Sequence, residues 1–271
     1  MAPGSGNSVR YKARPAVGQT LCVLDGLDQV DWAGHTHAFG EASDVPVLLR
    51  AVALGGDGAQ QAVNELFGTV WHQGTVYDVT PAVVPFLGEL AASEEVAERD
   101  RLMLLALLFA IGRGSGYWHR HAETISLLGK LPDDLDAQLT GEDEWVGASR
   151  AAVAHEASKL IARIGDFPDR LWLAVAVLMV VAGEERRSIA TALVQHHPPL
   201  PPLGDLGLQA LSELAIDGEL SSERVAALSA LDDELDYFVQ QLQQEDSVST
   251  VTMDSYFVDM LAERLCDTNG H

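Results

Sequence analysis

The sequence predicts an all-α fold, a superhelix built from stacked antiparallel helical hairpins. Hydrophobic residues make up 47% of the 271 positions but aromatic residues only 6%, and this composition suits layers of helices better than a β-sandwich. Helix start signals recur at short spacing, which is typical of paired helices stacked along a chain. The longest apolar runs, 102–111 and 171–182, are well short of the ~20 residues that a membrane-spanning helix needs. They indicate buried core helices and no membrane partner.

The first residues predict a disordered basic arm over 1–16 on a cytoplasmic protein. They combine Gly, Ser, Pro and Ala with Arg10, Lys12 and Arg14, and they contain neither an acidic residue nor the apolar stretch of a secretory signal. Helical repeats are expected over 17–197.

Capping residues and prolines mark the first helices of these repeats. Ser43-Asp44 precedes Val45-Pro46 and predicts a helix over about 44–54. The glycine-rich break at 55–58 separates it from a second helix, which we expect to end at Gly74. Thr80, as a cap before Pro81, predicts a third helix over 80–92.

The middle of the chain predicts a central helix and a boundary between two halves. Residues 100–112 are apolar on every face, so neighbours must cover this helix on both sides. A weaker helix over 121–129 follows a glycine-rich break. Residues 131–143 have the composition of an acidic loop, and one-face periodicity predicts a helix over 145–165.

Helices are also expected in the last part of the chain. Start signals predict helices over 168–182 and 184–196, and the proline-rich segment 198–203 predicts an extended spacer. Residues 204–271 are then expected to form C-terminal helices packed on the same solenoid, with helices over 205–217 and 250–266. One long helix should carry an apolar seam, which packs within the chain or against a coiled-coil partner; the seam consists of Leu228, Leu231, Leu235, Phe238 and Leu242.

Several stretches in the first half resemble a known family. These are Val30-Asp31-Trp32, the run 37–51, the run 62–68, and 71–90, where HQGTVY is followed by an AVPFL-x-EL-like segment. They are similar to a family of bacterial HEAT-repeat-like proteins of unassigned function, over about 30–130. Val79 departs from the usual small residue of that family. The resemblance implies a HEAT-like α-α superhelix with a broad binding surface and brings no reaction or catalytic residue.

The charge of the chain predicts the class of its partner. Forty acidic residues stand against seventeen basic ones, a net charge of −23, so ordinary binding to DNA or RNA is excluded. Residues 17–271 hold all forty acids and fourteen of the basic residues, a net charge of −26. We therefore expect a non-enzymatic protein that binds a basic protein, as a scaffold or as an immunity-like neutraliser.

The loop at 72–78 is the best candidate for a partner-binding or ligand-binding site. Its polar side chains could hold a peptide or substrate by hydrogen bonds, and aromatic residues of two interhelical loops could add contact area at one edge of the stack. The alternative is that the loop is a rigid corner between two helix pairs and that the aromatic residues belong to the core. The candidate residues are Trp71, His72, Gln73, Tyr77, Asp78, Tyr117 and Trp118.

A second hypothesis makes the protein an enzyme on the same helical frame. His72 would act as acid or base, with Tyr77 and Asp78 orienting it. No Gly-x-Ser-x-Gly, Walker A or His-Glu-x-x-His motif occurs in the sequence. We therefore assign no catalytic residue and expect no cofactor.

Two His-x-His pairs raise the question of a metal site. His35/His37 and His119/His121 each place two imidazoles on one side of an extended chain, but two ligands do not make a site. We expect surface or capping histidines and no metal. Cys22 and Cys266 lie far apart in the sequence without a Cys-x-x-Cys pair, which argues against a disulfide framework or zinc finger.

Overall fold

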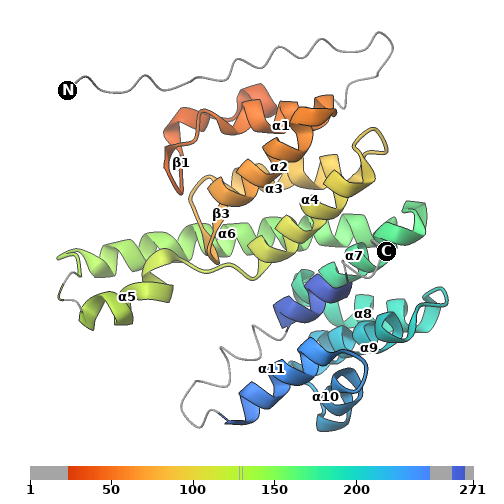
Figure 1. Ribbon diagram of the computed structural model, residues 1–271. Coiled ribbons are helices and arrows are strands. Elements are labelled where there is room, and N and C mark those ends of the chain that lie inside the picture. The colour runs from red at the N-terminus through yellow and green to blue at the C-terminus, as the bar shows by residue number, and fades with distance from the viewer. Residues whose placement is uncertain (1–23, 128, 130, 245–257, 266–271) are drawn as a thin grey trace, which may run out of the picture.

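The computed structural model describes residues 24–127, 129, 131–244 and 258–265. The predicted basic arm, both cysteines and the first part of the predicted helix over 250–266 lie outside the described residues. The chain is mostly helical, with two short β-hairpins near its N-terminal end, so the all-α prediction is confirmed (Figure 1).

The N-terminal elements alternate helix pairs with hairpins. The first hairpin pairs β1 (Thr36–His37) with β2 (Gly40–Glu41), and the second pairs β3 (Trp71–His72) with β4 (Thr75–Val76); both are antiparallel. The helices are α1 (Val45–Leu54), α2 (Asp57–Thr69) and α3 (Thr80–Ala92). The predicted helices over 44–54 and 80–92 are therefore confirmed, and α3 continues through Pro85.

The predicted end of the second helix is wrong, because α2 ends at Thr69 and the chain then turns through a hairpin. Gln73 and Gly74 both have positive φ, 50° and 86°, the conformation that a two-residue hairpin turn requires. Thr80 also acts differently from the predicted cap. Its hydroxyl accepts a hydrogen bond from the Tyr77 amide and donates one to the Val70 carbonyl (2.9 and 2.7 Å), which fastens the hairpin to α2.

The centre of the molecule consists of α4 (Glu98–Gly112), α5 (Tyr117–Leu127) and α6 (Leu135–Ala162). As predicted, α4 is covered by neighbours, which are α3, α6 and α7 (Asp169–Val177). The acidic loop predicted over 131–143 is wrong: most of it forms the first turns of α6, which runs across the whole molecule (Figure 1). The acidic residues are tolerated there because they lie mostly on the solvent side of the helix.

The C-terminal part contains two further corrections. The helices are α8 (Arg186–His196), α9 (Pro202–Asp217), α10 (Ser222–Ser229), α11 (Asp233–Gln244) and a helix at 258–265. The last two residues of the predicted spacer therefore belong to α9. The prediction of a single long helix with the leucine seam is also wrong, because Leu231 lies between α10 and α11 and is 48% exposed. One continuous apolar core includes residues from both sides of the spacer.

Candidate functional site

The hairpin at 71–76 is pinned by the loop that leads into α5. The Ser115 amide donates to the Gly74 carbonyl and the Val76 amide donates to the Ser115 carbonyl, both at 3.0 Å. Ser115 thus forms a parallel β-bridge with Thr75 of β4. This arrangement brings together the two loops that contain the predicted site residues.

Asp78 is engaged by the first hairpin and not by His72. One oxygen of Asp78 accepts hydrogen bonds from the amide and the hydroxyl of Thr36 (2.8 and 2.7 Å), and the other lies 3.3 Å from Nδ1 of His35. The carboxylate therefore ties the two hairpins together. This favours the rigid-corner interpretation for Asp78.

His37 has a structural role beside that corner. Its Nδ1 accepts a hydrogen bond from the Phe39 amide at 3.0 Å, so the proton of the neutral ring is on Nε2, which donates to Asp44 at 3.0 Å. Neither ring nitrogen is left for a metal ion. Within the described part of the chain, no group of three or more histidine, cysteine and acidic side chains is arranged to hold a metal.

The proposed acid/base residues are not brought together. The His72 ring packs edge-on against Phe39, with ring centres 5.5 Å apart, while Asp78 faces Thr36 and His35. Burial, with a smaller effect from Tyr117, raises the pKa of Tyr77 above its usual value. Tyr77 is therefore held in its neutral form, and Asp78, the carboxylate expected to orient His72, is bound to Thr36 and His35 instead.

Trp71 and Gln73 differ in their exposure. The Trp71 ring is half-buried and packs edge-on against Phe67, with ring centres 6.0 Å apart. Gln73 is exposed at the tip. Of the predicted site residues on this hairpin, Gln73 is the exposed one, whereas Trp71 and His72 are half-buried.

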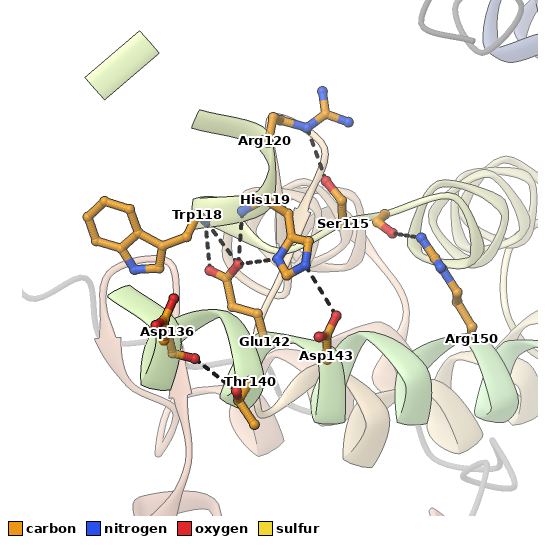
Figure 2. Close-up of polar contacts among 10 residues, drawn as sticks. Ser115, Trp118, His119, Arg120, Asp136, Thr140, Glu142, Asp143 and Arg150 are labelled. Atoms are coloured by element: carbon orange, nitrogen blue, oxygen red, sulfur yellow. Dashed lines mark hydrogen bonds and ion pairs between the residues drawn. The ribbon is translucent and has the colours of Figure 1, made fainter. Parts of the chain in front are cut away.

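A buried carboxylate that the sequence does not predict as functional organises the start of α5. Glu142 of α6 is 3% exposed, and it accepts hydrogen bonds from the backbone amides of Trp118 and His119 (Figure 2). These are among the first amides of α5, which have no partner within their own helix. Gly116 makes room for the carboxylate, since a Cβ there would overlap Glu142.

His119 extends this contact to the surface. Its Nδ1 lies 3.2 Å from Glu142 and its Nε2 lies 3.2 Å from Oδ1 of Asp143. The two carboxylates on adjacent positions of α6 therefore hold the imidazole between them (Figure 2). Gly116 precedes α5 and has no side chain that could cap the helix, which indicates that another part of the chain supplies the cap. The residue that supplies it, Glu142, lies in the segment whose composition predicts a loop.

Aromatic and acidic side chains meet on the outer side of α5 and the first turns of α6. Tyr117 is 43% exposed and packs edge-on against Trp118, with ring centres 5.2 Å apart. Exposed acids occur just before α6 and in its first turns, and one of them, Asp143, contacts His119 of α5. We define the α5–α6 surface as Tyr117, Trp118, Asp133, Asp136, Asp143 and Glu144.

Comparisons with protein-family models, with curated proteins and with solved structures give no match to this chain. None of the described helices combines the length and the apolar character needed to cross a membrane.

Proposed function

We propose that this protein is a non-catalytic binding protein whose α5–α6 surface engages a basic protein. The observation that carries the proposal is exposed Tyr117 packed on half-buried Trp118, on a helix that packs against the acidic first turns of α6. Aromatic side chains are enriched among the residues that dominate binding energy at interfaces. The neighbouring carboxylates supply the charge that selects a basic partner.

The surface is held rigidly, which lowers the cost of binding. Glu142 fixes the first turn of α5 on α6 through two backbone amides, and His119 adds a contact to each of two carboxylates. A preorganised surface loses less conformational entropy when a partner binds. The charge of the whole chain, −23, attracts a basic partner from a distance.

Two finer statements belong to the same proposal. The helix pairs would form a HEAT-like stack that presents this surface, and the partner would be a cellular protein held on a scaffold or a basic toxin that the chain neutralises. The contacts of the hairpin favour binding over the alternative acid/base enzyme, because Asp78 is occupied by Thr36 and His35.

The test is affinity capture of the tagged full-length chain from its native cell extract at low salt. The variant Tyr117→Ala/Asp136→Asn/Glu144→Gln removes one aromatic ring and two charges from the α5–α6 surface. The control Tyr237→Ala/Asp233→Asn/Glu223→Gln makes the same chemical changes at exposed positions of α10 and α11.

We expect one basic protein to be retained in a fixed ratio by the wild type and by the control, and to be lost from the surface variant. Equal retention by all three chains would contradict the assignment of the surface. Failure of any basic protein to be retained by the wild type would contradict the proposed function.

A further inference from the structure

A cavity of about 430 Å³ lies beside the hairpin at 71–76, between α2, α4, α7 and the helix at 258–265. Pockets that bind small molecules commonly have volumes of about 300–1,000 Å³. The walls are mostly apolar, and the large side chains among them are Phe67, Trp71, Leu102, Met103, Phe109 and Val177. This cavity is separate from the α5–α6 surface.

The cavity exists because small residues line the facing helices. Ala106 and Ala110 on α4 face Ala174 on α7 and Ala262 on the C-terminal helix. Larger side chains at these positions would fill the space that the helices enclose. The backbone of Gly74 completes the wall on the hairpin side.

Four charged residues also line this apolar space: the cations Arg113 and Arg120 and the carboxylates Asp259 and Glu263. The Nε of Arg113 donates to Oδ1 of Asp259 at 2.6 Å, which ties the C-terminal helix to the end of α4. The Arg113 guanidinium also lies 5.7 Å from the centre of the Phe109 ring. This ion pair closes part of the wall.

Arg120 is the second cation at the cavity, and it is held differently. Its guanidinium lies against the backbone of Gly74, where a Cβ would overlap it. Its Nε donates to the Ser115 hydroxyl at 3.3 Å, and Figure 2 shows the end of the guanidinium directed away from Ser115. Burial raises the pKa of Asp259, and the charges of Arg113 and Arg120 oppose that rise, so exposed Arg120 lies within electrostatic reach of this carboxylate. Among the ion pairs of the described residues, Asp259 is joined to Arg113 and none includes Arg120.

We propose that the cavity binds a small amphipathic carboxylate, with its apolar body between α4 and α7 and its carboxylate on Arg120. The planar guanidinium presents two parallel N–H donors that match a carboxylate. The apolar walls accept a hydrocarbon chain or ring and exclude water from it. This inference goes beyond the proposed protein-binding function and is independent of it.

The test measures binding of three ten-carbon probes to the full-length chain by titration calorimetry: decanoate, decan-1-ol and decylammonium. The probes share an apolar body and differ in the charge of the head group. We expect decanoate to bind at least about tenfold more tightly than decylammonium, because an ion pair with Arg120 is worth on the order of a tenfold change in affinity.

Two variants locate the binding. Arg120→Met keeps the apolar stem and removes the charge, so decanoate binding should weaken by about tenfold while decan-1-ol binding stays the same. Ala106→Phe fills the cavity and should remove the binding of both probes. Arg186→Met and Ala148→Phe are the matched controls at exposed positions away from the cavity, and both should bind decanoate as the wild type does.

Three results would overturn the proposal. The first is that the wild type does not bind decanoate, and the second is that decylammonium binds as tightly as decanoate. The third is that Ala106→Phe, with wild-type circular dichroism, still binds decanoate. Because the readout is a small-molecule affinity, failure here leaves the protein-binding test unaffected.

Discussion

At the scale of single residues, buried and half-buried polar side chains hold the corners of this fold. Asp78 joins two hairpins, Thr80 fastens a hairpin to α2, and Glu142 caps α5 from another helix. Each side chain bonds to backbone groups that would otherwise lack a partner. Because such contacts join residues far apart in the sequence, the hydrogen-bond partners of these side chains could not be predicted from the sequence.

Glu142 gives the first prediction at this scale. Replacing Glu142 by Ala leaves the amides of Trp118 and His119 without their acceptor, and we expect a loss of about 1–3 kcal/mol of unfolding free energy. Glu142→Gln keeps one acceptor oxygen and should lose less. Urea unfolding measures both values, and hydrogen exchange at 117–120 should accelerate in Glu142→Ala. Unchanged exchange there would contradict the capping role.

Asp100 gives a prediction about pH. Burial raises the pKa of Asp100 above its usual value, although the charge of Arg99 acts in the opposite direction. Burial disfavours the ionised form, so the folded state is penalised at pH values above the raised pKa. The penalty is relieved as pH falls through the raised pKa towards the usual value of 3.8.

The wild type should therefore gain stability relative to Asp100→Asn as the pH is lowered through this window. Because the other carboxylates are the same in both chains, the difference in unfolding free energy between them reports on Asp100 alone. Urea unfolding of both chains at a series of pH values measures it. A difference in stability that does not change with pH would contradict the assigned shift.

At the scale of elements, the local sequence was sufficient to predict the bounds of α3 but not the start of α6. Thr80-Pro81 marks the start of α3, and the predicted range 80–92 agrees with the structure. The start of α6 lies in a segment with Asp133, Asp134 and Gly141, whose composition favours a loop. The packing of α5 on α6 and the cap at Glu142 outweigh that local preference.

The break between α10 and α11 had a local signal that the leucine spacing concealed. The spacing of Leu228, Leu231 and Leu235 fits one continuous helix. The Asp232 carboxylate, however, accepts hydrogen bonds from the amides of Glu234 and Leu235 at 3.0 Å, in the manner of a helix cap. The aspartate following Leu231 could therefore have indicated a new helix start.

The continuity of α6 can be tested at Thr140, which is exposed within the segment that was predicted to be a loop. Thr140→Ala and Thr140→Gly both remove the hydrogen bond from the hydroxyl to the Asp136 carbonyl. If residue 140 is helical, the glycine variant should be less stable than the alanine variant by about 0.5–1 kcal/mol. Equal stabilities in urea unfolding would contradict a helix through this position.

At the scale of the whole molecule, the sequence predicted the helical class and part of the candidate site. Tyr117 and Trp118 were chosen as partner-binding candidates, and both lie on the α5–α6 surface. Three of the four acids of that surface, Asp133, Asp136 and Asp143, fall in the segment whose composition predicts a loop, so the sequence does not indicate their place beside α5. The hairpin residues His72 and Asp78 were chosen together, yet the fold directs them to different neighbours.

The net charge of −23 bears on the proposed binding of a basic partner. Exposed carboxylates distributed over a rigid helical frame create a negative field that extends beyond single contacts. Such a field accelerates encounter with a basic partner and weakens as salt screens it. The aromatic pair on α5 would then determine how long the complex lasts.

The most direct measurement of the central claim is the association rate constant of the captured basic protein at about 50 mM and about 500 mM NaCl, by stopped-flow fluorescence. Steering by the acidic surface predicts a rate that falls by about tenfold or more across this range. The α5–α6 surface variant should have a slower rate at low salt and a weaker salt dependence than the α10–α11 control. A rate that is the same at both salt concentrations would contradict the account.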